Sequence, residues 1–178
     1  MLVGAALWLT APETADPTVE AESGDPEQGR VFYLAGGCLG CHKPAADAEG
    51  SDPGLPSGGH PLPSPVGTFH APNITPHEDS GIGAWSFSDF VTAMREGTSP
   101  GGNHYFPAFP YASYRTMSEQ DLAHLYAYLM TLEPVDAPSR GHDIVASGLL
   151  RPFLGIWKAM ALGERGFTPD TSRSESWN

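Results

Sequence analysis

Apolar residues recur every three or four positions in three stretches of the chain, and this is the period of an amphipathic helix. The first stretch begins at Asp25 and Pro26, a typical N-cap and first helical residue, and ends before Gly36. The other two span residues 86–97 and 118–132, and each begins with a serine followed three residues later by an aspartate. No stretch predicts a strand, so we expect an all-α fold with three main helices.

The segments between these helices are long. Residues 43–73 contain seven prolines and five glycines, and residues 104–114, called here the aromatic loop, contain five aromatic side chains. Loops of this length need a surface on which to lie. Three short helices also bury too few apolar side chains to offset the entropy of ordering the backbone, about 1 to 2 kcal/mol per residue. We therefore expect a further apolar body in the middle of the domain.

The only two cysteines lie in the run Cys38-Leu39-Gly40-Cys41-His42, which has the C-x-x-C-H pattern of covalent haem attachment. Cysteines three residues apart at a helix end can form thioethers with both vinyl groups of one porphyrin, while the adjacent histidine points at the iron. One covalently attached haem c on Cys38, Cys41 and His42 would also supply the missing apolar body.

Three other chemistries of the same motif stay open. A redox-active C-x-x-C pair normally lies on a strand-to-helix turn, which the pattern here does not predict. A disulfide that closes a four-residue loop would suit an exported protein but would stabilise it little. A zinc site would need Cys38, Cys41 and two more histidines, and the sequence has no H-x₃₋₅-H pair.

The order of these features resembles a class I c-type cytochrome: a helix that begins with proline, then C-x-x-C-H, a wrapping loop and two capped helices. The runs APNITP at 71–76, GIGAWS at 81–86 and residues 106–114 are similar to the haem domains of periplasmic dehydrogenase cytochrome subunits, such as those serving alcohol, aldehyde and gluconate dehydrogenases. The resemblance covers about residues 25–133 and implies one haem domain there. It also implies that Asn73, Thr75 and Trp85 lie beside the haem propionates.

The resemblance leaves the second iron ligand in question. Many relatives read Pro-Ala-Met-Pro-Tyr in the aromatic loop, whereas this chain has Phe109 where they have methionine. Phenylalanine cannot coordinate iron, and the nearest thioether is that of Met117, so we expect His42 and Met117 as the iron ligands. The alternative for Met117 is a packing role, as an N-terminal staple against Leu122.

We do not expect three further side chains, each of a type that can bind iron, to act as ligands. Met94 lies on the apolar face of the second helix and is expected in the core. His104 is expected to be a polar loop residue. His124 falls on the side of the third helix away from its leucines, so we expect it to face solvent.

Charge and the two ends of the chain complete the domain prediction. The sequence has 21 acidic and 9 basic residues, a net charge of −12, which argues against a nucleic-acid partner.

Residues 1–24 are interpreted as an apolar remnant of a signal or anchor, too short to span a bilayer, followed by an acidic flexible tether. Residues 134–178 are expected to form a C-terminal extension with one amphipathic helix and a linker-like end. The helix packs on its own domain or, through residues 144–162, docks on a partner or membrane complex.

These observations predict a periplasmic monohaem cytochrome c that is not itself an enzyme. It would carry electrons between a dehydrogenase or another cytochrome and a terminal acceptor such as an oxidase. Two alternatives stay open. The first is a haem enzyme or a gas or redox sensor with an open distal site, because of Phe109. The second is a docking subunit of a larger membrane electron-transfer complex.

Overall fold

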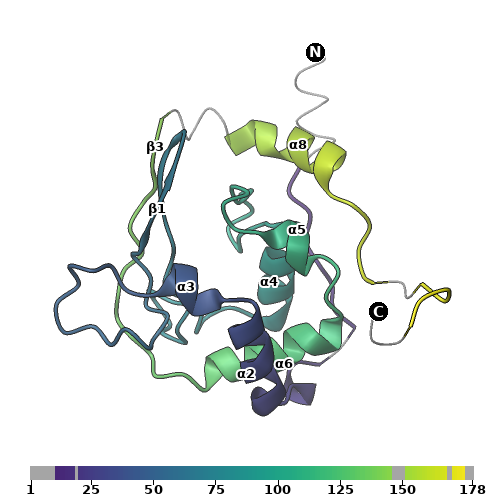
Figure 1. Cartoon of the computed structure of the whole chain (residues 1–178), viewed down its shortest axis with the longest axis horizontal. Coiled ribbons are helices and arrows are strands. Elements are labelled where there is room, and N and C mark those ends of the chain that lie inside the picture. The colour runs from purple at the N-terminus through teal and green to yellow at the C-terminus, as the bar shows by residue number, and fades with distance from the viewer. Residues whose placement is uncertain (1–10, 19, 146–150, 168–169, 175–178) are drawn as a thin grey trace.

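The computed structural model describes residues 11–18, 20–145, 151–167 and 170–174 of the 178-residue chain. The apolar stretch at residues 1–9, and residues 146–150 of the predicted docking segment, lie outside the described residues. Figure 1 shows helices packed around a common centre, with a narrow hairpin rising on one side and α8 lying across the end opposite α2 and α6.

Helix α2 (Pro26–Ala35) begins as predicted, because the Asp25 side chain accepts a hydrogen bond from the backbone N–H of Glu27. It packs against α6 (Glu119–Met130), whose N-cap Ser118 accepts from the N–H of Asp121. The two helices approach closely at Gly29, where a Cβ atom would lie only 1.9 Å from the carbonyl oxygen of His124. Glycine at this position therefore permits the crossing.

The sequence predicts His124 in solvent, and this prediction is wrong. The Nδ1 atom of His124 accepts a hydrogen bond from the backbone N–H of Asp25 at 2.7 Å, and its ring stacks on that of Phe32. The imidazole therefore serves as an additional cap at the start of α2, a contact that the periodicity of α6 alone cannot indicate.

The predicted second helix divides into two parts. Helix α4 (Phe87–Val91) begins with the expected capping box of Ser86 and Asp89, and a π-helical turn, η2 (Thr92–Glu96), follows it directly. Gly97 ends the turn in the left-handed conformation, with φ 57°. A Cβ atom there would lie within 2.7 Å of the Tyr111 ring, so glycine also admits α5 (Tyr111–Tyr114) against this turn.

The structure contains a small antiparallel sheet, so the all-α expectation is wrong in this respect. Strands β1 (Pro61–Ser64) and β2 (Gly67–His70) form a hairpin, and β3 (Asp143–Ile144) pairs with β2. Prolines at alternate positions of β1 hid the strand in the sequence, but they are tolerated because β1 is at the sheet edge. The sheet joins the long loop to the C-terminal extension.

Residues 11–18 lie along the helices, in contrast to the flexible tether expected for this part of the chain. The Ala15 N–H donates to Thr92 Oγ1 at 2.8 Å, and the Ala15 carbonyl accepts from Ser88 Oγ at 2.6 Å. The Thr18 hydroxyl donates to Glu119 Oε2 at 2.7 Å, and the short 3₁₀ helix η1 (Ala21–Ser23) follows. Backbone groups of this segment thus find specific partners, which composition alone does not reveal.

The C-terminal extension contains the predicted helix, as the 3₁₀ turn η3 (Arg151–Phe153) followed by α8 (Leu154–Ala161). Trp157 lies edge-on to the Tyr111 ring at 6.2 Å, and Lys158 is buried. The helix therefore packs on its own domain, while Phe153 and Met160 stay exposed. Within the described part of the chain, no helix combines the length and apolar character needed to cross a bilayer.

The hydrophobic core lies between α2, α4 and α6. Met94 is part of it, as predicted. A second set of apolar side chains packs against this core but is only partly buried, and it includes residues from four separate segments: Cys38, Leu39, Ile74, Trp85, Phe109, Tyr114 and Met117.

Candidate functional site

The C-x-x-C-H motif forms a helix of its own, α3 (Cys38–His42), at an angle to α2. Gly37 makes the turn between the two helices in the left-handed conformation, with φ 64°, where a residue with a Cβ atom would be strained. Cys38 is half-buried and Cys41 exposed, and both are free thiols. One helical turn therefore presents two unpaired thiols and an imidazole.

The His42 ring is fixed by one hydrogen bond. Its Nδ1 atom lies 2.8 Å from the carbonyl oxygen of Pro72. A carbonyl can only accept, so Nδ1 must carry the proton, and a neutral ring then has its lone pair on Nε2. Burial lowers the pKa of His42 and favours this neutral form. The side chain is therefore prepared as a metal ligand through Nε2, with the outer hydrogen bond that such ligands usually have.

The three competing chemistries of the motif find little support in this geometry. Burial raises the pKa of the Cys38 thiol to about 11, which disfavours the thiolate that a redox-active pair needs. The two thiols are not joined in a disulfide. Among the described residues, no three His, Cys, Asp or Glu side chains gather as a zinc site would require.

Gly58 supports the His42 region, a role that the sequence did not reveal. Its N–H donates to the His42 carbonyl at 2.7 Å, and its φ is 79°. A Cβ atom at Gly58 would lie 2.5 Å from the Asn73 nitrogen and 2.7 Å from the Pro72 carbonyl oxygen, the atom that holds His42. The only sequence signal is the glycine pair at 58–59 within a loop that is rich in glycine throughout.

Asn73 and Thr75 are buried, but their polar groups are engaged within the chain. The Thr75 N–H and hydroxyl both donate to Asn73 Oδ1, at 2.9 and 2.8 Å. Asn73 Nδ2 donates to the Val135 carbonyl at 2.8 Å, and the Val135 N–H donates to Thr75 Oγ1 at 3.1 Å. These side chains therefore hold residues 135–145, called here the C-terminal strap, against the His42 region. The expected role of Asn73 and Thr75 beside the propionates stays a prediction.

Trp85 packs next to the core and is held by a hydrogen bond to its backbone, while its expected place beside the propionates stays a prediction. The Tyr126 hydroxyl donates to the Trp85 carbonyl at 2.8 Å, and the Trp85 side chain packs against the core. It thus belongs to the partly buried apolar set rather than to the polar network around Asn73.

The aromatic loop reaches the motif through Tyr114, whose hydroxyl lies 3.4 Å from the carbonyl oxygen of Gly36. Phe109 packs on the Tyr114 ring with centroids 5.9 Å apart. The Met117 N–H donates to the Tyr114 carbonyl at 3.0 Å, and Met117 packs against the core cluster that includes Leu122. Phe109 and Met117 thus lie in one short stretch, anchored beside Cys38, and both are partly buried.

His104 is buried at the start of the aromatic loop, where the sequence predicts a polar loop residue. Its carbonyl accepts from Arg151 Nη1 at 3.0 Å, and its ring lines a cavity with Lys158. His104 therefore lies beside η3 and α8, which carry Arg151 and Lys158.

The partly buried apolar set gives the site its chemical character. The Cys38 thiol, the Met117 thioether, and aliphatic and aromatic side chains from the segments at 38–39, 74, 85 and 109–117 pack against the core with part of their surface outside it. Together with the lone pair at His42 Nε2, this arrangement suits a flat apolar group that carries a metal ion. A covalently attached haem fits these requirements.

The Cytochrome c family model matches residues 26–133. The chain is 44% identical over 165 residues to a diheme cytochrome c-type protein of Cereibacter sphaeroides, a match that covers 92% of this chain and 55% of that protein. It is 33% identical to the fructose dehydrogenase cytochrome subunit of Gluconobacter japonicus, over 96% of this chain and 34% of that one. It is 36% identical to the gluconate 2-dehydrogenase cytochrome c subunit of Pantoea cypripedii, over 81% and 30%. The chain thus spans about half the length of the first relative and less of the other two.

Proposed function

Because the chain belongs to the cytochrome c family, we propose that this part of the protein is a monohaem electron carrier with haem c attached at Cys38 and Cys41. The observation that carries the proposal is the hydrogen bond from His42 Nδ1 to the Pro72 carbonyl, which prepares Nε2 as an axial ligand within the C-x-x-C-H helix. The haem, when bound, supplies a centre that takes up and releases one electron.

Each cysteine would form its thioether by adding a thiol S–H across one vinyl double bond. Sulfur bonds to one vinyl carbon and hydrogen to the other, so nothing is released and no oxidant is consumed. The exposed Cys41 and half-buried Cys38 are three residues apart on α3, as the two vinyl groups of one porphyrin require.

We propose Met117 as the second axial ligand. The support is its thioether chemistry and its place at the end of the aromatic loop, where it is partly buried with Phe109 and Tyr114. Ligation by His42 and Met117 would raise the reduction potential of the iron and would leave it no position for a further ligand. Such a centre carries electrons without binding small ligands.

The partner proposed for this carrier is a dehydrogenase, another cytochrome or an oxidase, and the proposed location is the periplasm. Support comes from relatives that are cytochrome subunits of fructose, gluconate and alcohol dehydrogenases. The exposed Phe153 at the end of η3 and the exposed Met160 on α8 offer apolar contacts for membership of a larger membrane complex.

The first test uses the holoprotein and two variants. We expect the intact mass of the wild type to equal the chain plus one haem, and His42→Ala to lose the low-spin spectrum. We expect the ferrous wild type to ignore carbon monoxide and Met117→Ala to bind it. Identical spectra for Met117→Ala and wild type would exclude Met117 as the ligand.

A second candidate function rests on Phe109, which is packed among the rings of Tyr105, Tyr111 and Tyr114. An aromatic wall without a ligand would make the protein a haem enzyme or a gas or redox sensor with an open distal face. In that case the wild type would be high-spin and would bind carbon monoxide or cyanide rapidly at neutral pH.

A further inference from the structure

A buried carboxylate lies at the end of the π-helical turn, outside the site described above. Glu96 is only 4% exposed, and its Oε2 atom accepts from Arg115 Nη1 at 2.6 Å. Its Oε1 atom lies 2.9 Å from Arg165 Nε, which belongs to the C-terminal extension and also pairs with Glu13. Two guanidinium groups from distant parts of the sequence thus converge on one buried acid.

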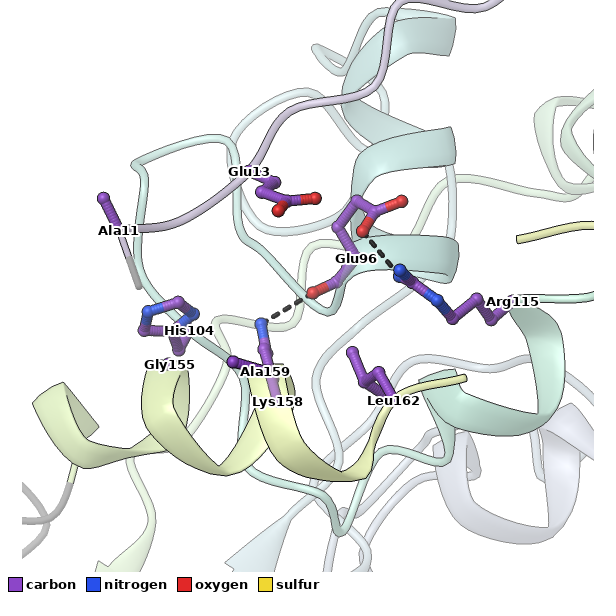
Figure 2. A pocket seen from close by; sticks show the side chains of 9 residues that line it. All are labelled: Ala11, Glu13, Glu96, His104, Arg115, Gly155, Lys158, Ala159 and Leu162. Atoms are coloured by element: carbon purple, nitrogen blue, oxygen red, sulfur yellow. Dashed lines mark hydrogen bonds and ion pairs between the residues drawn. The ribbon is translucent and has the colours of Figure 1, made fainter. Parts of the chain in front are cut away.

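Lys158 reaches the same place from α8. Its ammonium donates to the carbonyl oxygens of Glu96 and Gly97, both at 2.6 Å, and lies 5.0 Å from the centroid of the Tyr111 ring. Figure 2 shows Lys158 pointing from α8 to the Glu96 backbone, with Arg115 on the other side of the Glu96 carboxylate. A lysine 8% exposed is rare unless it is paired, so this contact is specific.

These groups border a cavity of about 200 Å³ that Glu13 and His104 also line. The charged groups on its wall are engaged with one another, with Arg165 or with backbone carbonyls, so the cavity is not proposed as a ligand site. Its position matters more, because its lining brings residues of α8 together with His104, at the start of the aromatic loop, and with Arg115, directly after the end of the loop.

The contacts continue from Glu96 to Met117. Arg115, two residues before Met117, donates to the Arg95 carbonyl at 3.1 Å and to the Gly163 carbonyl at 2.7 Å. Arg95 in turn donates to the Met117 carbonyl and pairs with Glu119 at 3.4 Å. The backbone that carries the Met117 side chain is therefore fixed on one side by η2 and on the other by residues after α8.

We infer that Glu96 and Lys158 are positioning residues, through which the C-terminal extension holds the aromatic loop and Met117 in place. The inference rests on the proposed function, because it assigns the contacts to the axial-ligand side of the haem. It also goes beyond the family match, since Lys158 lies outside residues 26–133. Loosening either contact should raise the population in which Met117 is away from the iron.

A purely structural role predicts a different pattern. Lys158→Met removes the cost of burying the ammonium but leaves the Glu96 and Gly97 carbonyl oxygens without their donor, so the two contributions to the free energy of unfolding oppose each other. If Lys158 only stabilised the fold, a core variant with the same loss of stability would open the iron to ligands equally. A positioning role instead predicts faster access to the iron than such a core variant shows.

The experiment compares holoprotein variants Glu96→Gln and Lys158→Met with Ala123→Gly. Ala123 is fully buried in α6, and its carbonyl lies beside Gly24, so this control weakens the core on the side of η1. We expect both positioning-residue variants to accelerate carbon monoxide binding to the ferrous protein about tenfold or more. We also expect faster hydrogen exchange across residues 104–117 and a lower reduction potential, whereas the control should change none of the three.

The outcomes separate the inference from the proposed function. Equal carbon monoxide binding by the control and the two positioning-residue variants would overturn the positioning role, as would unchanged exchange across residues 104–117. A wild type that binds carbon monoxide as readily as Met117→Ala would instead overturn the proposed ligation. In that case faster exchange in the Glu96 and Lys158 variants would still show that the contacts order the loop.

Discussion

The two sides of the candidate haem site are held by different kinds of contact. On the His42 side, backbone groups and neutral side chains meet at short range: the Pro72 carbonyl, the Gly58 N–H and the Asn73 amide. On the Met117 side, charged groups from distant segments converge on the Glu96 carboxylate and on the Met117 carbonyl. The contacts around His42 itself are short and uncharged, whereas the second side depends on ion pairs.

The C-terminal extension contacts both sides, and it does so in these two different ways. The C-terminal strap joins the His42 side by hydrogen bonds to Asn73, Thr75 and Ser80, and by the pairing of β3 with β2. Helix α8 joins the Met117 side through Lys158 and Trp157. One segment therefore links the two loops that carry the proposed iron ligands.

Among the variants on the His42 side, Gly58→Ala should cause the largest loss of stability. The new Cβ atom would press on the Pro72 carbonyl and the Asn73 nitrogen, so we expect a loss of about 2 to 4 kcal/mol in stability and a perturbed low-spin spectrum. Gly50→Ala is a matched control, because Gly50 has a φ of 75° but no atom within 4 Å of its Cβ position. It should cost only about 1 kcal/mol. Equal losses in the two variants, measured by denaturant unfolding, would contradict the role of close packing at Gly58.

A smaller effect is expected from Asn73→Ala. The variant removes the acceptor of two Thr75 hydrogen bonds and the donor to Val135, at a cost of about 1 to 3 kcal/mol. Hydrogen exchange should accelerate at the amides of Val135 and Ala137. Asn103→Ala, in an exposed loop, should leave both quantities unchanged. Stable protein with a protected strap would show that Asn73 does not hold it.

The same contrast explains what can be predicted from the sequence. Helices α2 and α6 and the capping box at Ser86 are predictable because caps and apolar periodicity are local signals. The C-x-x-C-H motif is local as well, and its helix α3 places the candidate ligand on the expected element. Each of these features depends on residues within four positions of one another.

The missed features depend on partners far apart in the sequence. Strand β3 pairs across about 75 residues with β2, and its two residues carry no strand pattern of their own. The hydrogen bond from Asn73 to the Val135 carbonyl joins residues 62 positions apart, and no local pattern indicates it. In the sequence Glu96 is like any charged residue at a helix end, and only the fold brings Arg115 and Arg165 to it. The charged side of the site is therefore the less predictable one.

A pH dependence tests the charged side through Lys158. Burial lowers the pKa of Lys158 from 10.5 to about 8, although the Glu96 carboxylate opposes the shift, and burial raises the pKa of Tyr111 from 10.0 to about 12. Between pH 8 and 10 the unfolded chain binds a proton on Lys158 that the folded protein does not, so stability should rise with pH. Above pH 10 the folded protein keeps the Tyr111 proton that the unfolded chain loses, so the trend should reverse.

The slope from either group is at most about 1.4 kcal/mol per pH unit, which denaturant titrations at a series of pH values can resolve. The charged neighbours of Lys158 are Glu96, Glu13 and Arg115, with His104 on the same cavity wall. Lys158→Met should remove the rise between pH 8 and 10. Tyr111→Phe should reduce the fall above pH 10 without abolishing it, because burial also raises the pKa values of Tyr33, Tyr105, Tyr114 and Tyr126. If the stability of Lys158→Met still rose between pH 8 and 10, another group would titrate in that range. The contacts around Glu96 would then not govern the pH dependence.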